Sequence, residues 1–387
     1  MRICVVTATR AEFGLLSGLM RLIDDSTAFE LQVVVSGTHL LEDFGNTVQD
    51  IANEGFSVSR TVDSITQART GFDVASQVGA GITGFANAFT ELDPDFVVVL
   101  GDRYEMFAAT QAAFFLGIHT LHIHGGEVTH GALDDSIRHA ITKLASVHCV
   151  AHEEYASRVI QLGEQPESVH IVGSLGIDQL HNTALQTRQE LEIDLDMEIN
   201  DPVLLVSYHP VTNGQSDARN EALELVASLE GMEKATIILT MPNADPGHQF
   251  ISEIFRAAAE GNGPGWVFRE SLGRVRYWSV MALAAVVVGN SSSGLLEAPS
   301  FPTATVNIGP RQSGRIVADS VVSCEPNKDS ITQALEQALS GPFQQELRNV
   351  ENPLGGPGAA KRIFRVLESV SKSNLERKIF YDLGREK

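Results

Sequence analysis

The chain has 387 residues, 43% of them hydrophobic and 20% charged, which is typical of a soluble globular protein. A formal net charge of −21 argues against general binding to nucleic acid or to anionic membranes. Three widely separated cysteines, Cys4, Cys149 and Cys324, exclude a disulfide framework and a zinc ribbon and favour a reducing compartment. No apolar run has the length of a signal-peptide core or a membrane span, so we expect a cytoplasmic protein.

Short apolar runs rich in β-branched residues alternate with helical patterns along the chain. The predicted strands are 3–9, 31–37, 95–101, 119–125 and 169–174, followed by 203–209, 235–242, 284–290 and 303–309. Because these runs are nearly continuous in apolar residues, they predict parallel strands covered on both faces. The alternation of strand and helix predicts an α/β protein built from two Rossmann-like, doubly wound domains.

A polar, acidic stretch without strand character, 183–201, marks the predicted domain junction. We expect an N-terminal Rossmann-like domain over 1–185, a C-terminal one over 186–358, and a helical tail, 359–387, that packs back on the first domain. Two such domains form an interdomain cleft. Since ligands bind at the carboxyl ends of parallel strands, the strand-end residues of both halves are expected to face that cleft.

The segment GAGITG at 79–84 matches the dinucleotide pattern G-x-G-x-x-G literally. The preceding residues, 70–78, do not have the pattern of a buried strand, so the strand–turn–helix context of that motif is missing. We therefore predict no dinucleotide cofactor. The glycines are better explained as relieving crowding in a packed helix.

Two predicted strands of the first half end in charged residues. Arg10 follows the first strand at the turn into a helix, where backbone N–H groups also point, and this suits a phosphate or pyrophosphate. The alternative is a surface salt bridge with Glu12. Asp102 directly follows the strand 95–101, as a general base or ligand anchor would. Its alternative role is to cap the helix that begins near Tyr104.

The segment HIHGGEVTHGALDDSIRH, 122–139, contains four histidines around a Gly-Gly turn. His122 and His124 alternate on a predicted strand and so share a face, which is a possible metal-binding pattern. No cysteine or second H-x-H lies nearby to complete a closed site, so we do not predict a metal. The Gly-Gly turn instead favours close approach of the backbone to a ligand.

Carboxylates flank this turn on both sides. The stretch 133–144 predicts a helix with Asp134 or Asp135 at its cap, and Glu127 and Asp134 can converge with Asp102 in the cleft. Partly desolvated carboxylates that crowd together have separated pKa values, so that one accepts a proton while another donates one. The alternative is a solvated acidic loop.

In the second half, His209 ends a predicted strand and can stabilise a departing phosphate or donate a proton. Its alternative is a hydrogen-bonded structural histidine.

The motif GNSSSGLLEAPS follows a further strand. Ser291 and Ser292 offer hydroxyl and backbone N–H groups that can cradle a phosphate without a lysine. Glu297 can accept hydrogen bonds from two vicinal hydroxyls such as those of ribose. Arg311 and Arg315 come after the next strand and are candidates for holding negative charge. Together these residues predict a nucleotide site.

The motifs taken together resemble the hydrolysing UDP-N-acetylglucosamine 2-epimerases, which make N-acetylmannosamine and related sugars for sialic-acid-type biosynthesis. They span nearly the whole chain in order: TATRAEFG, SGTHLLEDFGNT, GDRYEMFA, HIHGGE through SIRHAITK, VIQLGE, SYHPVT, GNSSSGLLEAPS and NIGPRQSGR. The resemblance implies the two-domain fold of type B glycosyltransferases. Pro-Val-Thr after the histidine favours the hydrolysing branch. Ala8 and the segment 352–358 depart from the family pattern.

The resemblance also implies roles for individual residues. The catalytic residues it implies are Asp102, Glu127, Asp134 and His209. The UDP contacts it implies are Arg10, Asn243, Ser291, Ser292, Glu297 and Arg311. No metal and no cofactor are implied.

The implied reaction converts UDP-N-acetylglucosamine and water to N-acetylmannosamine and UDP, by elimination to a 2-acetamidoglucal and then hydration. Three alternatives stay open: the same reaction on UDP-2,4-diacetamido-2,4,6-trideoxyglucose for legionaminic acid, a UDP-sugar glycosyltransferase that needs an acceptor, and a non-catalytic UDP-sugar sensor. We expect a homodimer or homotetramer, with no nucleic-acid or membrane partner.

Overall fold

A computed structural model describes residues 1–42, 45–63, 70–129, 133–211, 217–232, 234–242, 247–370 and 378–384. The chain divides into two compact units, Met1–Gln179 with Leu354–Lys387, and Leu180–Pro353. The sequence predicted these two boundaries after residues 185 and 358, a few residues further along the chain. Within the described ranges, no helix is both long and apolar enough to cross a membrane.

The first unit contains a seven-stranded parallel sheet with strand order β3-β2-β1-β4-β5-β6-β7. Its strands are β1 (Arg2–Thr7), β2 (Glu30–Ser36), β3 (Arg60–Val62), β4 (Phe96–Leu100), β5 (His119–Ile123), β6 (Val147–Val150) and β7 (Val169–Ile171). The helices up to the unit boundary are α1 (Arg10–Asp24), α2 (Val48–Asn53), α3 (Gly71–Leu92), α4 (Tyr104–Phe115), α5 (Leu133–Leu144), α6 (Glu153–Gln161) and α7 (Leu175–Asn182). The segment GAGITG lies inside α3, so it does not follow a strand.

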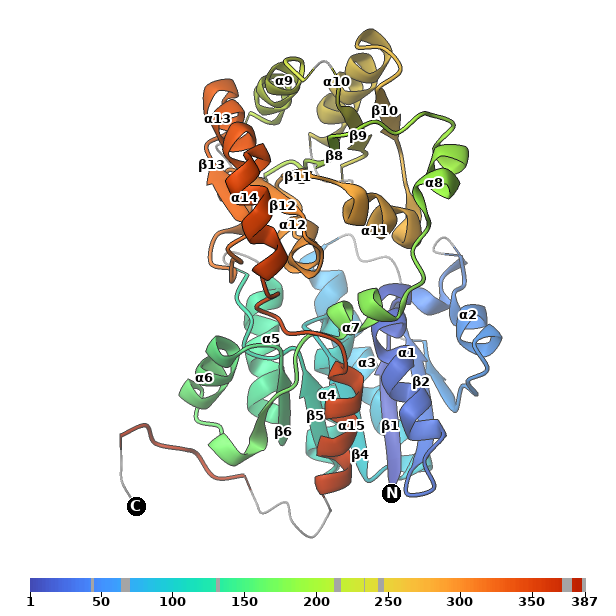
Figure 1. Ribbon diagram of the computed structural model, residues 1–387. Coiled ribbons are helices and arrows are strands. Elements are labelled where there is room, and N and C mark those ends of the chain that lie inside the picture. The colour runs from blue at the N-terminus through green and yellow to red at the C-terminus, as the bar shows by residue number, and fades with distance from the viewer. Residues whose placement is uncertain are drawn as a thin grey trace. The chain divides into compact units, whose positions relative to one another are not determined.

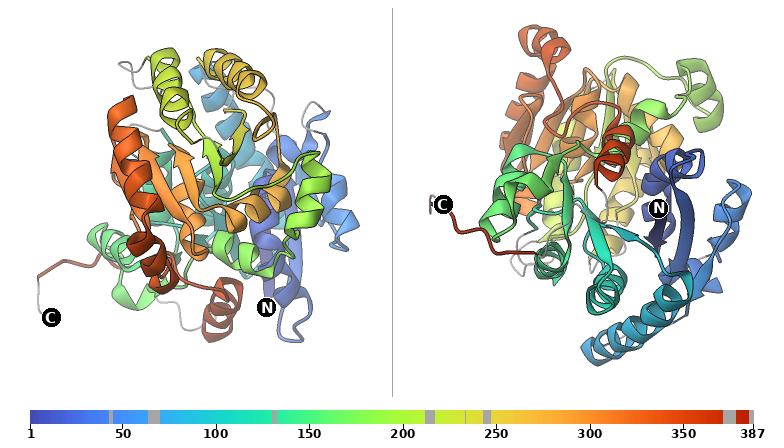
Figure 2. Two further views of the ribbon diagram at one scale, coloured as in Figure 1. Left: turned by 45° about the horizontal axis from the view of Figure 1, so that its top comes forward. Right: turned by 90° about the horizontal axis from the view of Figure 1, so that it is seen from below.

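Successive residues of β1 enter cores on opposite faces of this sheet. Ile3 and Val5 pack with residues of α1, while Cys4 and Val6 pack with residues of α3 and α4. Figure 2 shows helices on both faces. Because both faces are buried, the central positions of the strand, Ile3 to Val6, are all apolar, and each fully buried aliphatic side chain contributes about 1.5–3 kcal/mol. This explains the continuous apolar runs of the sequence.

The helix α15 (Ala359–Ser369) belongs to the first unit and packs against α1 (Figure 1). Its Ile363 and Leu367 are fully buried in the core that α1 also enters. The carboxylate of Asp178 accepts hydrogen bonds from the backbone N–H groups of Gly358 (2.6 Å) and Ala360 (2.9 Å), which fixes the start of the helix. The last part of the chain therefore completes the first hydrophobic core.

The second unit contains a six-stranded parallel sheet with strand order β10-β9-β8-β11-β12-β13. Its strands are β8 (Val203–Ser207), β9 (Thr236–Thr240), β10 (Trp266–Arg269), β11 (Val286–Gly289), β12 (Ala304–Ile308) and β13 (Val321–Cys324). Its helices include α8 (Arg188–Leu195), α9 (Ala218–Leu229), α10 (His248–Gly261), α11 (Gly273–Leu283), α12 (Ser293–Leu296), α13 (Lys328–Leu339) and α14 (Gly341–Glu346). Again two hydrophobic cores cover opposite faces of the sheet.

Both sheets have the strand order of a doubly wound fold, with the direction of winding reversing beside the first strand. In the first unit the reversal falls between β1 and β4, and in the second between β8 and β11. Ligands of open parallel sheets bind beyond the carboxyl ends of the strands at this point. The predicted fold class, two Rossmann-like doubly wound domains, is confirmed.

Four strands were not predicted from the sequence: β3, β6, β10 and β13. Each has three or four residues. Three of them form sheet edges, where one side of the strand is unpaired. Runs this short do not establish a periodicity of their own, so only pairing with a neighbouring strand defines them.

Candidate active site

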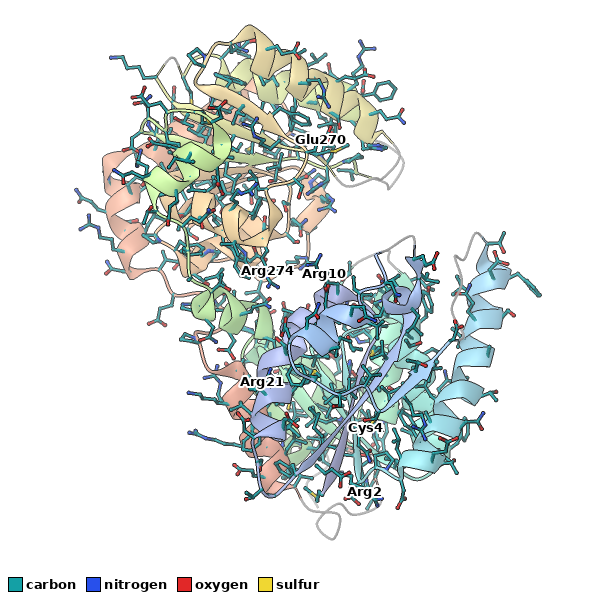
Figure 3. The ribbon with its side chains drawn as sticks, turned by 90° about the vertical axis from the view of Figure 1, so that its right-hand side faces the viewer. Arg2, Cys4, Arg10, Arg21, Glu270 and Arg274 are labelled. Atoms are coloured by element: carbon teal, nitrogen blue, oxygen red, sulfur yellow. The ribbon has the colours of Figure 1, made fainter. Side chains whose placement is uncertain are left out.

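In the first unit, the turn after β1 is held by a buried carboxylate. Oε2 of Glu12 accepts hydrogen bonds from the backbone N–H groups of Ala8 (2.8 Å) and Thr9 (3.2 Å). The Thr9 side chain caps α1 in return, so the two residues form a capping box. Arg10 begins the helix with its side chain 78% exposed and pairs with Asp50 at 3.2 Å rather than with Glu12 (Figure 3).

A second buried carboxylate, that of Glu105, lies in the first turn of α4, shortly after the end of β4. Arg103 donates hydrogen bonds to both oxygens of the fully buried Glu105, at 3.1 and 2.8 Å, and comes within 3.9 Å of Glu12. Burial raises the pKa of Glu12 to about 7. The residue at the N-cap of α4 is Arg103, so Asp102 is not the cap that the sequence offered as its alternative role.

Arg138, on α5, organises the polar residues beyond β4 and β5. Its guanidinium is buried and donates to Oδ2 of Asp102, to the carbonyl oxygen of Glu127 (2.9 Å) and to Thr129 Oγ1 (3.3 Å). It also lies 3.5 Å from Asp135 Oδ1. The planar fork of an arginine can hold several acceptors in fixed directions at once. One side chain thus joins the end of β4, the loop after β5 and the start of α5.

The helix predicted over 133–144 is α5, but Asp134 and Asp135 lie in its first turn and not at its cap. Partial burial of the Asp134 carboxyl group and the neighbouring charge of Asp102 raise the pKa of Asp134. A raised pKa makes the carboxyl group hold its proton more tightly than an ordinary aspartate does, which favours the role of acid over that of base. Asp102 and Asp134 therefore lie close enough to influence each other's charge.

The two histidines of the H-x-H pattern have different surroundings. His122 is fully buried, its Nε2 bonds to the carbonyl oxygen of Gly101 (2.8 Å), and its Nδ1 to Thr142 Oγ1 (3.1 Å). Burial lowers the pKa of His122 to about 3, so this ring is neutral. β5 ends at Ile123, and His124 takes a left-handed backbone with φ of 64°. Strand alternation therefore does not extend to His124, whose Nδ1 lies 2.7 Å from Glu127 Oε1.

The Gly-Gly turn serves protein packing. Gly126 has φ of 78°, and a Cβ atom there would lie 2.3 Å from the carbonyl oxygen of Tyr155 on α6. Only glycine fits such a contact. This packing accounts for glycine at position 126, and the expected approach of a ligand to the turn stays a prediction. Within the described part of the chain, no three His, Cys, Asp or Glu side chains are grouped as metal ligands.

In the second unit, Asn290 connects three strand ends. Its Oδ1 accepts from the backbone N–H of His209 (2.7 Å), and its Nδ2 donates to the carbonyl oxygen of His209 (2.8 Å). The carbonyl oxygen of Asn290 accepts from Arg311 Nη1 (3.0 Å) and Gln312 Nε2 (2.8 Å). His209 follows β8, Asn290 follows β11, and Arg311 lies in the short turn Pro310–Gln312 after β12. Predicted site residues from distant parts of the sequence are thus held together.

A chain of hydroxyl groups orders the serine loop. The Tyr277 hydroxyl, on α11, bonds to Ser293 Oγ (2.6 Å) and to Ser207 Oγ (3.1 Å). Ser293 Oγ in turn donates to Ser291 Oγ at 3.0 Å. Ser292 is the N-cap residue of α12. Tyr277 on α11 therefore holds the serine loop and connects it to Ser207 at the end of β8.

Glu297 is held by the indole of Trp278, whose Nε1 donates to its Oε2 at 2.8 Å. Burial raises the pKa of Glu297, although the indole bond partly offsets it. In the same motif, a Cβ atom on Gly294 would lie 2.7 Å from Thr305 Cγ2, so this glycine lets α12 pack on β12. Asn243 lies outside the described residues.

Three residues that organise these sites were not candidates in the sequence. Arg138 could have been found, because it lies one helical turn after Asp134 on the predicted helix. Asn290 ends a predicted strand, which is a weak signal. Tyr277 has no local signal, since its partners are separated from it in the sequence.

The comparisons with known proteins agree with the two doubly wound sheets. The model of the UDP-N-acetylglucosamine 2-epimerase family matches residues 21–368. A GDP/UDP-N,N′-diacetylbacillosamine 2-epimerase (hydrolyzing) from Campylobacter jejuni is 35% identical over 383 residues, which cover 99% of both chains. A UDP-N,N′-diacetylbacillosamine 2-epimerase (hydrolyzing) from Legionella pneumophila is 32% identical over 369 residues, 95% of this chain and 96% of the relative.

Among solved structures, UDP-GlcNAc 2-epimerase from Neisseria meningitidis bound to UDP-GlcNAc has a TM-score of 0.78 at 17% identity, covering 96% of this chain and 100% of that one. The fold is therefore of the type B glycosyltransferase kind, with two Rossmann-like units. The chain belongs to the hydrolysing UDP-N-acetylglucosamine 2-epimerase family. This confirms the family expected from the sequence motifs.

Proposed function

We propose that the protein is a hydrolysing 2-epimerase that converts a UDP-2-acetamido sugar and water to UDP and the free sugar inverted at C2. The observation that carries the proposal is the arrangement around Arg138. Asp102 pairs with this guanidinium, Glu127 is attached to it through its backbone, and the pKa of nearby Asp134 is raised. Proton-accepting and proton-donating groups in one place are what inversion at a carbon centre needs.

The chemistry follows from the acidity of the sugar. The C2 hydrogen is not acidic while the C1–O bond is intact. When UDP begins to leave, the positive charge that develops at C1 acidifies C2, and a base of the first unit removes the proton to give a 2-acetamidoglucal. Water then adds to C1 while a carboxylic acid returns a proton to the opposite face of C2. Asp102, Glu127 and Asp134 supply these groups, and the raised pKa of Asp134 suits the acid.

In the same proposal the leaving diphosphate is stabilised by hydrogen-bond donors and positive charge. Glu297 binds the ribose hydroxyls, and His209 stabilises the departing phosphate or donates a proton to it. The other proposed UDP contacts are Arg10, Asn243, Ser291, Ser292 and Arg311. Asn290 is hydrogen-bonded to both His209 and Arg311, which supports a common role for these two residues at the diphosphate.

Two sugars compete as substrate. The Campylobacter and Legionella relatives carry names that specify N,N′-diacetylbacillosamine, and this supports its UDP derivative as the first candidate. This is the diacetamido-trideoxy sugar that the sequence offered as the alternative. UDP-N-acetylglucosamine, the first expectation from the sequence, is second, because the family description specifies it.

The test is to incubate the purified protein with each UDP-sugar in deuterated water and to identify the released monosaccharide by NMR. We expect UDP release without an acceptor, inversion at C2 and one deuterium at C2. Turnover that requires an acceptor would identify a glycosyltransferase, and binding without turnover would identify a sensor. An inverted product without deuterium at C2 would exclude the proton-exchange mechanism.

A further inference from the structure

The contact between His124 and Glu127 fixes the position of a proton. The Nδ1 atom of His124 lies 2.7 Å from Oε1 of Glu127. An ionised carboxylate can only accept a hydrogen bond, so Nδ1 must carry the hydrogen. In the neutral imidazole, Nε2 then has a free lone pair and is a base. His122, two residues earlier, has partners at both ring nitrogens instead.

The Nε2 atom of His124 is buried and has no hydrogen-bond partner among the residues that the structure describes. A buried polar atom without a partner is unfavourable. The residue also has φ of 64°, a left-handed conformation that is unfavourable outside glycine. His124 is connected to the other candidate residues through Glu127, whose carbonyl oxygen accepts a hydrogen bond from Arg138. Two unfavourable features at a residue so connected point to a function for it.

We infer that His124 is the base that removes the C2 proton and that Glu127 is a positioning residue that acts through it. This inference rests on the proposed function and replaces one assignment in it, because the base becomes His124 in place of a carboxylate. The bond between Glu127 and the ring favours orientation of the imidazole over direct attack on the sugar, as a carboxylate orients histidine in a catalytic triad. Asp134 keeps the role of the acid.

The C2–H bond breaks, its proton moves to Nε2 of His124, and its electron pair forms the C1=C2 double bond. The C1–O electron pair leaves with UDP. On hydration, protonated Asp134 gives its proton to C2 and the oxygen of water bonds to C1. The proton lost by that water restores Asp134, and His124 releases its own proton to solvent.

The inference has a structural consequence. The His124 side chain as a whole is 18% exposed, while Nε2 itself is covered. The ring or the groups that cover it must therefore move when the sugar binds. A ring held at Nδ1 by Glu127 can pivot about that hydrogen bond without losing its tautomer.

The experiment compares His124→Asn, His124→Ala and Glu127→Gln with the wild type. The asparagine amide can still donate to Glu127 but has no counterpart of Nε2. The matched control is His148→Asn, because His148 pairs with buried Glu164 at 3.0 Å in the same unit, outside the proposed site. Thermal unfolding and the Kd for UDP report on folding. The kcat for UDP release and the deuterium content at C2 report on chemistry.

We expect His124→Asn to lower kcat at least about 100-fold, the usual range for a general base, with the Kd for UDP within about threefold of wild type. Imidazole should restore activity to His124→Ala, more strongly for more basic imidazoles. Glu127→Gln should lower kcat about 10- to 100-fold, as loss of an orienting partner does, and the double variant should be no worse than His124→Asn. The His148→Asn control should change the unfolding temperature without lowering kcat of the folded protein.

Retention of kcat within tenfold in His124→Asn, or losses that multiply in the double variant, would overturn the inference. If the His124 variants do not fold, Glu127→Gln decides alone: a kcat reduced by no more than about 100-fold supports Glu127 as a positioning residue, and abolished turnover makes Glu127 the base. A wild type that turns over no UDP-sugar refutes the proposed function. A wild type and His124→Asn that turn over alike refute only the inference.

Discussion

Asn290 binds the backbone of His209 from both sides, accepting its N–H at 2.7 Å and donating to its carbonyl oxygen at 2.8 Å, although 81 positions separate the two residues. The end of β8 and the start of the serine loop therefore cannot shift independently. A change at Asn290 should therefore affect His209 and Arg311, the two proposed phosphate-side residues that it contacts.

Replacing Asn290 with Asp tests this coupling. The aspartate can still accept from the His209 N–H, but it places a carboxylate against the His209 carbonyl oxygen in a buried position. Loss of a buried hydrogen bond costs about 1–3 kcal/mol, so UDP should bind about 5- to 150-fold more weakly in calorimetry. Asn262→Asp is the control. Asn262 follows α10 and also donates a side-chain hydrogen bond to a backbone carbonyl oxygen, that of Ala258 (3.0 Å), but it is not among the residues proposed to bind UDP. Equal UDP affinity in both variants would contradict the coupling.

Tyr277→Phe removes the hydroxyl that bonds to Ser293 and Ser207 but keeps the ring. Because one neutral hydrogen-bonded group is lost, the Kd for UDP should rise about fivefold, equivalent to about 1 kcal/mol. Tyr208→Phe loses a comparable bond, to Glu221 at 2.8 Å, in the same unit. That control should lower the free energy of unfolding while leaving UDP affinity unchanged. The idea fails if both tyrosines affect UDP binding equally.

Arg138→Lys keeps the positive charge but loses the fork that reaches Asp102, Glu127 and Thr129 together. We expect kcat to fall about 10- to 100-fold and the first unit to lose about 1–3 kcal/mol, because buried acceptors lose their donors. Steady-state kinetics and urea unfolding measure the two effects. The control, Arg2→Lys, changes an exposed ion pair with Asp93 at 2.6 Å (Figure 3) and should affect neither quantity. Wild-type kcat in Arg138→Lys would show that the fork is dispensable.

Glu12 makes stability depend on pH. Its pKa is raised from 4.5 to about 7 by burial, so the folded chain binds a proton more tightly than the unfolded chain. The associated stability is present below pH 4.5 and is lost as pH rises through 7, by about 3 kcal/mol. Glu12→Gln can keep the capping box without titrating. Its unfolding free energy relative to wild type should therefore increase between pH 5 and pH 8 in urea titrations. A pH-independent difference would contradict the assigned pKa.

Local patterns in the sequence determined the fold class, most strands and the helix over 133–144. The reason is that a parallel strand buried on both faces is apolar at most positions, and an amphipathic helix repeats its apolar residues at helical spacing. The family also followed from the sequence, because its motifs occur in order along the chain.

Tertiary structure decided which polar residues became partners. Arg138 meets Asp102 across 36 positions and Asn290 meets His209 across 81, and no local pattern specifies such pairs. The short edge strands β3, β10 and β13 exist only through pairing with a neighbour. His124 lies outside the strand, although the sequence predicted a strand over 119–125, because β5 ends at Ile123 and the backbone of His124 is left-handed. Sequence periodicity reports burial, whereas the direction and partners of a buried polar side chain depend on contacts that form only when distant strand ends meet.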